Sequence, residues 1–168
     1  LGLGGGPVWG SARERLLWVD SEAGRVFAGR LDADRLSIDT TLEFDERVGS
    51  VLPASDGGLV VAGERAVHVL DPDGRRTRSI RILPDDVDSR LNDAACDPAG
   101  RLLVGSISHD GRTGEESLWS VAGDGGVTRL VDGVTVSNGI GFSPDGSRMY
   151  YVDSRPGVIR VFDYDADS

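Results

Sequence analysis

The chain has 168 residues, of which 39% are hydrophobic and 24 are glycine, and it carries a formal net charge of −10. This acidity argues against nucleic acid as a partner, because binding to phosphates requires a basic surface. No apolar run approaches the ~18–20 residues of a membrane span, and no basic segment followed by an apolar stretch predicts a signal peptide, so we expect no membrane partner.

Cysteine usage favours a cytoplasmic location. Cys96 is the single cysteine, so the chain cannot form an internal disulfide. A secreted protein remains the alternative. Because Cys96 falls in a predicted strand, we expect it to be a small buried hydrophobe.

A short pattern recurs four times along the chain. Its copies begin at Gly5, Gly49, Asn92 and Asn138, and an apolar strand follows each start after ten or eleven residues. Turn sequences such as Asp97-Pro98-Ala99-Gly100 separate the two segments. Short strands with a period of about 43 to 47 residues are typical of a β-propeller, in which each copy is one blade. The predicted blades are 5–46, 47–89, 90–134 and 135–168, within a single domain spanning 1–168.

Three copies contain up to four strands each, and the fourth copy lacks its outer strand. The predicted strands are Pro7–Trp9, Leu16–Asp20, Arg25–Leu31 and Ile38–Phe44; Gly49–Pro53, Leu59–Ala62, Ala66–Leu70 and Thr77–Leu83; Asn92–Asp97, Leu102–Gly105, Ser117–Val121 and Val127–Val131; then the opening strand at Asn138, Met149–Asp153 and Val158–Phe162. No segment has a sustained helical period, so the fold class is all-β.

About three and a half blades do not close a ring. We expect this sequence to be part of a longer chain, with other copies of the chain as the alternative source of the missing blades. Exposed blade edges predict poor stability of the isolated chain, or self-association through those edges. The aromatic residues in strands are expected to form blade core: Trp9, Trp18, Trp119, Phe142 and Tyr150.

The opening strand of each propeller blade lines the central channel. Residues that open successive copies should therefore converge on one axis. Asn92 and Asn138 open the third and fourth copies, so the repeat predicts a shared polar site. The alternative for Asn138 is a turn cap before Gly139.

Several motifs, in this order and spacing, resemble the senescence marker protein/gluconolactonase family, which includes regucalcin-like sugar lactonases. The motifs are Gly6-Pro7-Val8-Trp9, Leu16-Leu17-Trp18-Val19-Asp20, Arg90-Leu91-Asn92-Asp93, Asp97-Pro98-Ala99-Gly100-Arg101, Ser137-Asn138-Gly139, Ser143-Pro144-Asp145-Gly146, Met149-Tyr150-Tyr151-Val152-Asp153-Ser154 and Phe162-Asp163-Tyr164-Asp165. The resemblance implies a six-bladed propeller, of which this chain looks like the N-terminal part.

The resemblance also implies a metal-dependent hydrolase that opens sugar lactones to aldonic acids. Its cofactor would be a divalent cation such as Ca²⁺, Zn²⁺, Mn²⁺ or Mg²⁺, with Asn138 as one ligand. The position of the family's metal-binding glutamate is occupied by Gly5 in this chain. The family's later aspartate, which is the expected base, would lie beyond Ser168 and so outside the described residues. One ligand of three remains, so tight metal binding by this chain alone is not expected.

Substrate contacts are implied at three further residues. Arg90 and Asn92 match the pair that hydrogen-bonds substrate hydroxyls and the lactone ring, and Asp110 matches an acidic substrate contact. The alternatives are that Arg90 pairs with Asp85, Asp86 or Asp88, and that Asp110 lies in a solvated loop. His68 is predicted to be structural.

Two functions follow from these observations. The first is a lactone hydrolase acting on a small-molecule sugar lactone. The second is a non-catalytic propeller, a degenerate member of the family that acts as a binding module, because the position of the metal-binding glutamate is Gly5.

Overall fold

The computed structural model describes residues 2–166 and contains β-strands without helices in this range. No segment there meets the length and hydropathy of a bilayer-crossing helix. The strands are β1 (Gly4–Gly10), β2 (Arg15–Asp20), β3 (Arg25–Asp32), β4 (Arg35–Glu43), β5 (Ser50–Pro53), β6 (Leu59–Ala62), β7 (Ala66–Leu70), β8 (Arg76–Arg81), β9 (Ser89–Cys96), β10 (Leu102–Ser108), β11 (Glu116–Val121), β12 (Val127–Val134), β13 (Ser137–Phe142), β14 (Arg148–Asp153) and β15 (Val158–Asp163).

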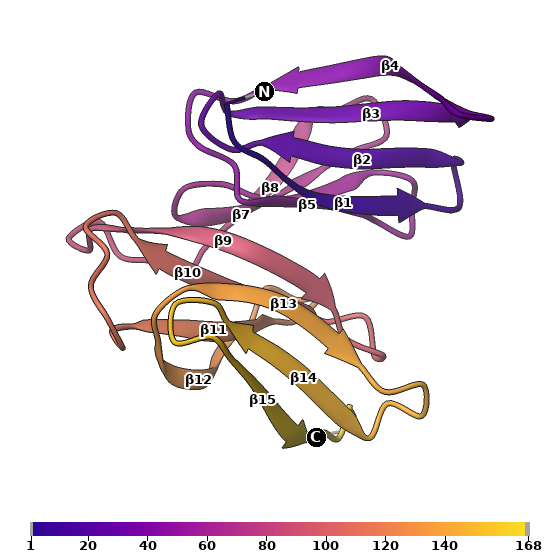
Figure 1. Cartoon of the computed structure of the whole chain (residues 1–168). Coiled ribbons are helices and arrows are strands. Elements are labelled where there is room, and N and C mark those ends of the chain that lie inside the picture. The colour runs from indigo at the N-terminus through magenta and orange to yellow at the C-terminus, as the bar shows by residue number, and fades with distance from the viewer. Residues whose placement is uncertain (1, 167–168) are drawn as a thin grey trace. The chain divides into compact units, whose positions relative to one another are not determined.

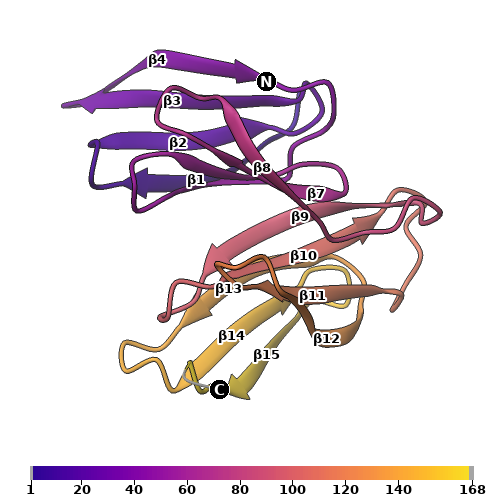
Figure 2. The same ribbon diagram turned by 180° about the vertical axis from the view of Figure 1, so that it is seen from behind.

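Within the described residues the strands form four antiparallel sheets in chain order. Three sheets have four strands, β1–β4, β5–β8 and β9–β12, and the last has three, β13–β15 (Figure 1). Each strand pairs with its neighbour in sequence, as Figure 2 also shows from behind. The predicted strand order is confirmed, including the absence of a fourth strand from the last sheet in the described range.

The chain divides into two compact units, Leu1–Arg81 and Ile82–Ser168. Each unit contains two of the sheets. We call the sheets blades 1 to 4 in chain order.

The core of the first unit lies between blades 1 and 2. Apolar side chains from both sheets and from the segment between them form one cluster in which every member is at most 4% exposed. Its members are Leu17, Val19, Val26, Val48, Val51, Val61 and Leu70. Two apolar sheet faces packed in this way remove a large hydrophobic area from water, which is the main stabilising contribution to such a unit.

The core of the second unit lies between blades 3 and 4. Leu103, Leu118 and Val134 of blade 3 pack with Met149 and Tyr151 of blade 4. Residues 149 and 151 share one face of β14, because successive side chains in a strand point to opposite faces.

Three predictions of burial are wrong. Cys96 is exposed, Trp9 is 48% exposed and Tyr150 is 40% exposed. Successive side chains of a strand point to opposite faces, which explains the two aromatic residues. Val8 packs on the core of the first unit, so its neighbour Trp9 faces the other side of the sheet. Met149 and Tyr151 pack on the core of the second unit, so Tyr150 between them faces away from it. The prediction is confirmed for Trp18 and Trp119, each 9% exposed, and Phe142 packs against the second core.

Cys96 follows the same rule. The next residue, Asp97, is buried and bonds to Tyr164, which lies beyond the last strand of blade 4. Cys96 therefore points away from blade 4.

Asp97 connects the two blades of the second unit. Its Oδ2 accepts hydrogen bonds from the Tyr164 hydroxyl at 2.7 Å and from Nε of Arg101 at 2.7 Å. Burial alone would raise the pKa of Asp97, but these bonds and the backbone N–H of Arg101 outweigh it and lower the pKa. Burial, and then the bond to Asp97, raise the pKa of Tyr164 to about 12.

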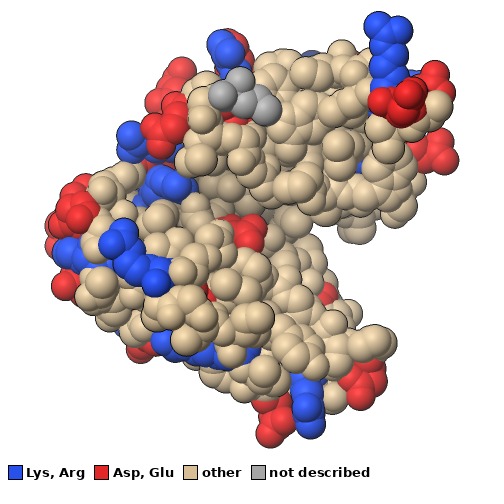
Figure 3. All heavy atoms as spheres, viewed as in Figure 1, with Lys and Arg blue, Asp and Glu red and all other residues tan. Residues whose placement is uncertain are grey.

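Charged side chains of both signs lie side by side mainly toward the edges of the surface seen in Figure 3. Many form exposed ion pairs, such as Arg25 Nε with Glu43 Oε1 at 3.1 Å. Exposed pairs of this kind add at most about 1 kcal/mol each to stability.

Replacing Leu118 by alanine should destabilise the second unit strongly. The side chain is 0% exposed, so Leu118→Ala leaves a cavity and should lower the free energy of unfolding by about 2–5 kcal/mol. Leu130→Ala is the control, because Leu130 is 42% exposed and should change stability by about 0.5 kcal/mol or less. Urea denaturation of the two variants measures the difference, and equal losses would contradict the assigned core.

The interaction of Asp97 should make stability depend on acid pH. Its folded pKa lies below the unfolded value of about 3.9, so its contribution is complete above that pH and is lost as pH falls through the folded pKa. Wild-type protein should be more stable than Asp97→Asn at neutral pH, and the difference should shrink below about pH 4. Denaturant titrations across this range test it, and a difference that stays constant down to about pH 2 would refute the assignment.

Candidate functional site

The opening strands of blades 1 and 4 have the same register. Gly5 pairs with Val19 in blade 1, and Asn138 pairs with Val152 in blade 4. In both strands the register shifts immediately afterwards, in a β-bulge. Gly5 is therefore the counterpart of Asn138, as the spacing within the repeat predicted.

A glycine follows each of these two positions, and its backbone requires it. Gly139 has φ +35°, and a Cβ added there would lie 2.8 Å from Cγ2 of Val152. Gly6 has φ +55° in the corresponding bulge of blade 1. Other residues would be strained in this left-handed conformation, so the bulge fixes how the preceding residue projects.

Aspartates at the ends of the second strands hold the opening strands in place. Asp153 is 1% exposed, and its two carboxylate oxygens accept the N–H groups of Thr135 at 2.9 Å and Val136 at 2.8 Å. These residues directly precede β13, so the carboxylate positions the strand that presents Asn138.

Asp20 has the same function in blade 1. It accepts the N–H groups of Gly2 at 2.9 Å and Leu3 at 3.3 Å, just before β1. The bond from Gly2 is the largest cause that lowers the pKa of Asp20. The repeated aspartate was visible in the sequence, but its pattern alone does not identify the N–H groups that it accepts.

A chain of hydrogen bonds connects the predicted site residues of the second unit. Arg90 Nη1 donates to Asn92 Oδ1 at 2.9 Å, and Asn92 Nδ2 donates to Asn138 Oδ1 at 3.0 Å. Asn138 Nδ2 donates in turn to Ser154 Oγ at 2.9 Å. The structure thus brings together Arg90, Asn92 and Asn138, three of the four site residues proposed from the sequence.

Further backbone contacts fix these side chains. Arg90 is 8% exposed and also donates to the Leu91 carbonyl at 2.9 Å, while Asn92 Nδ2 also donates to the Ser137 carbonyl at 2.7 Å. The amide of Asn92 therefore lies between the opening strands of blades 3 and 4. Hydrogen bonds to its Oδ1 from Arg90 and from its Nδ2 to Ser137 and Asn138 fix the orientation of this amide, as a preorganised binding group requires.

Asp93 was not predicted as part of this site. Burial raises the pKa of its carboxyl, although the N–H groups of Ala94 and Gly139 partly oppose this. It lies next to Asn92 and bonds the residue after Asn138, so it adds a carboxylate beside the amide pair. A sequence signal existed, since Asp93 directly follows a predicted site residue.

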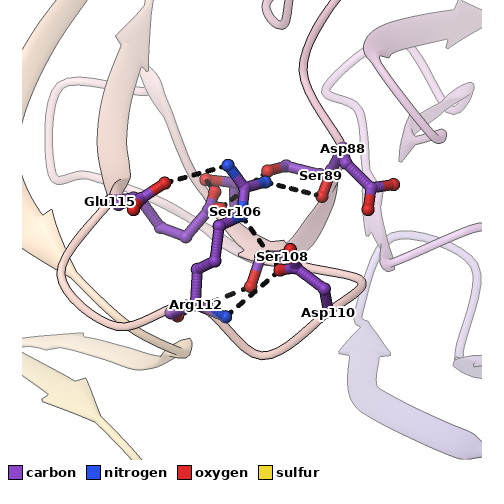
Figure 4. Close-up of polar contacts among 8 residues, drawn as sticks. Asp88, Ser89, Ser106, Ser108, Asp110, Arg112 and Glu115 are labelled. Atoms are coloured by element: carbon purple, nitrogen blue, oxygen red, sulfur yellow. Dashed lines mark hydrogen bonds and ion pairs between the residues drawn. The ribbon is translucent and has the colours of Figure 1, made fainter.

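Asp110 belongs to a separate, exposed cluster in the loop after β10. Arg112 Nε donates to Asp110 Oδ1 at 2.9 Å, and Arg112 Nη1 donates to Glu115 Oε2 at 2.9 Å. Arg112 also donates to the Asp88 carbonyl at 3.1 Å, so its side chain ties the loop to the residue that precedes β9, as Figure 4 shows. The bond from Arg112 is the largest cause that lowers the pKa of Asp110.

Directly after this loop, at the start of β11, comes a buried carboxylate that was not predicted from the sequence. Glu116 is 4% exposed and accepts hydrogen bonds from Ser89 at 2.6 Å and from Ser106. Nothing in the local pattern separates Glu116 from the adjacent, exposed Glu115. Three strands meet at this carboxylate, which ties the start of β11 to β9 and β10.

A divalent cation does not fit the donors found in the described residues. No group of three or more His, Cys, Asp or Glu side chains suited to a metal occurs among them. Asn138 Oδ1 already accepts a hydrogen bond from Asn92, and its blade 1 counterpart, Gly5, has no side chain. Asp93 is the one carboxyl group described beside Asn138, and burial raises its pKa, which disfavours the charged form that a divalent ion requires.

Space for a side chain exists at Gly5. A Cβ built there meets nothing within 4 Å, and its φ is outside the left-handed region. In blade 2 the buried Ser50 pairs with Ala62, and its hydroxyl has no hydrogen-bond partner among the described residues. The opening strands of the first unit therefore present a glycine and a serine, and sequence reasoning missed the serine.

Comparisons with known proteins identify related lactonases. The chain is 34% identical over 166 residues to Pentonolactonase XacC of Haloferax volcanii and 31% identical over 165 residues to regucalcin of Danio rerio. These alignments cover 99% and 97% of the chain, but 55% of each relative. The chain therefore spans about half the length of the curated relatives it matches.

Solved structures show the same fold. Regucalcin from Agrobacterium tumefaciens, described as a calcium-binding protein, matches with a TM-score of 0.87 and 27% identity, covering 98% of this chain and 55% of that one. A luciferin-regenerating enzyme matches with a TM-score of 0.86 and 28% identity, covering 98% and 57%. The prediction of an all-β propeller fold is confirmed.

The family described as the SMP-30/Gluconolactonase/LRE-like region matches residues 3–168. This match covers nearly the whole chain and agrees with the relatives named lactonase and regucalcin. The chain belongs to the SMP-30/gluconolactonase/LRE-like family.

Proposed function

We propose that the protein binds sugar lactones through Arg90 and Asn92 and opens them to aldonic acids. The observation that carries the proposal is the hydrogen-bonded series Arg90–Asn92–Asn138. Arg90 is buried, the two asparagines are partly buried, and the three residues come from two adjacent opening strands. Relatives named pentonolactonase and 6-deoxy-6-sulfogluconolactonase support the substrate class.

The chemistry of these side chains suits a polyol ester. Arg90 offers a planar set of N–H donors, and Asn92 offers a donor and an acceptor, which match the hydroxyl groups and ring oxygens of a sugar lactone. As hydrolysis begins, negative charge develops on the carbonyl oxygen. A guanidinium held within hydrogen-bond reach of that oxygen stabilises it.

Asp110 is part of the proposal as an acidic contact at the rim of the site. Its loop begins where β10 ends, and Ile107 in β10 pairs directly with Arg90 in β9. The exposed Arg112–Asp110 pair is weak enough to exchange with a bound hydroxyl group.

The metal requirement of the proposal depends on position 5. Asn138 supplies a neutral oxygen ligand, and a carboxylate at Gly5 would supply the charge that a divalent cation requires. With glycine at position 5, the proposed binding of the lactone by Arg90 and Asn92 involves no metal ion. The regucalcin described as calcium-binding makes Ca²⁺ the first ion to test.

A binding module without catalysis is the second candidate. Gly5 favours it, because the same register in blade 4 carries a side chain with ligand atoms and blade 1 carries none. Under this proposal the arginine and asparagine still bind the sugar, and hydrolysis does not follow. A fold alone does not decide between these functions.

Replacing Arg90 should weaken the action on lactones. Arg90→Ala removes a buried cation and its hydrogen bonds, which should lower kcat/KM by ~10–100-fold in the full-length protein, since bonds to charged groups contribute about 1.5–3 kcal/mol. Arg129→Ala is the control, because Arg129 is exposed and its charge pairs only at the surface with Asp132. Hydrolysis of gluconolactone and pentonolactones with a pH indicator measures the effect.

Equal activity of Arg90→Ala and wild-type protein would refute the assigned substrate contact. Loss of sugar-lactone binding in Arg90→Ala, with no hydrolysis by wild-type protein, would instead support the binding module. Calorimetric binding of the product acid separates these outcomes.

Introducing glutamate at position 5 should create metal affinity. Gly5→Glu has room for its side chain and supplies the missing charge, so Ca²⁺, Mn²⁺ or Zn²⁺ should bind the full-length protein ~10-fold more tightly or better. Isothermal titration calorimetry measures this, together with lactone hydrolysis. Gly123→Glu is the control, since it adds the same charge in an exposed turn with equal space.

A gain of affinity and hydrolysis in Gly5→Glu alone would mean that the rest of the site is intact. If both glutamate variants behave like the wild type, the opening strands have diverged more widely. That result would favour the binding module over the hydrolase.

A further inference from the structure

Blade 2 carries a second polar group that the lactone proposal does not use. Ser79 Oγ lies 2.9 Å from His68 Nδ1, and His68 Nε2 lies 2.8 Å from Glu46 Oε1. A hydroxyl, an imidazole and a carboxylate are thus joined in series. This is the order of groups by which a base activates a serine nucleophile.

The fold of blade 2 places these residues together. His68 in β7 and Ser79 in β8 are direct cross-strand partners, so their side chains share one face of the sheet. Glu46 comes from the segment between blades 1 and 2. Gly63 leaves the room they need, because a Cβ at this position would lie 2.6 Å from His68 Nε2 and 2.8 Å from Glu46 Oε2.

Hydrogen bonds to both oxygens of Glu46 fix the direction of the series. Oε2 accepts the N–H of Glu64 at 2.8 Å, which leaves Oε1 to accept from Nε2–H of His68. In that neutral tautomer Nδ1 carries a lone pair and accepts the Ser79 hydroxyl proton. The bond from His68 is the largest cause that lowers the pKa of Glu46, which keeps this carboxylate ionised.

The imidazole is held rigidly while the serine is accessible. His68 is 3% exposed and stacks on Phe44 with ring centroids 6.2 Å apart, whereas Ser79 is exposed. A nucleophile needs this combination of a fixed base and an open hydroxyl. A purely structural histidine needs only the burial.

A hollow of about 400 Å³ adjoins the series. It is lined by all three of these residues and by Arg65, Arg76 and Arg81. Strand pairing explains part of this lining, since Arg81 is opposite Ala66 and lies two residues from Ser79 on the same face of β8. Guanidinium groups beside a serine can stabilise the oxyanion that forms when an ester is attacked.

We propose that Ser79, His68 and Glu46 form a second, nucleophilic site that accepts the acyl group of small carboxylic esters. Ser79 Oγ attacks the ester carbonyl while its proton passes to His68 Nδ1. The bond from the carbonyl carbon to the leaving oxygen then breaks, and that oxygen takes the proton from His68. The alcohol departs at this point and leaves the acyl group on Ser79. Water then attacks the acyl carbonyl with the same two proton transfers, which regenerates Ser79 and releases the carboxylic acid.

The proposal is independent of the lactone site. It uses residues of the first unit only, and none of Arg90, Asn92 or Asn138 takes part. Variants that remove one activity should therefore leave the other unchanged.

Labelling of the full-length protein with a fluorophosphonate tests the proposal. Peptide mass spectrometry should find the phosphonyl group on Ser79, and Ser79→Ala should abolish both this label and the burst of 4-nitrophenol released from 4-nitrophenyl acetate. His68→Gln should slow labelling by ~100-fold or more, because the base is lost. Ser37→Ala is the control, since Ser37 is also an exposed serine on an outer strand and should change nothing.

Two further measurements keep the outcomes separate. Asn138→Ala should retain the label on Ser79 at the wild-type rate, whatever its effect on lactones. Thermal melting checks that Ser79→Ala, a small change at an exposed position, is folded. Absence of label on Ser79 in folded wild-type protein, or labelling that is as fast in folded His68→Gln, would overturn the proposal and leave His68 with a structural role.

Discussion

The candidate site depends on two aspartates that end the second strands of blades 1 and 4. Their carboxylates accept hydrogen bonds from backbone N–H groups just before the opening strands. Asp153 fixes the two residues before β13, and Asp20 fixes the two before β1. An N–H group buried without an acceptor is costly, so these bonds hold the opening strands in one register. The bulges that follow turn the residue at that register in a defined direction. The position of Asn138 is thus determined by the Asp153 carboxylate and by the bulge, which lie outside the hydrogen-bonded series Arg90–Asn92–Asn138.

The sequence predicted the strands well because their signals are local. Alternating apolar residues and turn sequences such as Asp97-Pro98-Ala99-Gly100 depend only on neighbouring residues, and the structure has strands at each predicted place. The equivalence of Gly5 and Asn138 also came from spacing alone. Both positions pair with the valine that precedes a strand-end aspartate.

Burial and polar contacts were harder to predict, because they depend on which sheet covers which face. Trp9 and Tyr150 have strongly apolar rings, yet each lies on the face of its strand opposite the core. The bond between Asn92 and Asn138 joins residues that are 46 positions apart, and the sequence could predict only that they converge. The series Glu46–His68–Ser79 has no sequence signature, since a cross-strand pair and an interblade segment create it.

Gly5 has no side chain at the position that corresponds to Asn138, and the fold of blade 1 does not require one. Neither the packing of blade 1 nor the bonds of Asp20 involve a side chain at that position, and a Cβ built there meets nothing within 4 Å, so the sheet does not depend on which residue occupies it. Codons for glycine and glutamate can differ by one nucleotide. Under the proposed metal requirement, a charged ligand at this position could therefore be lost or regained in a single mutational step, with no compensating change elsewhere in the sheet.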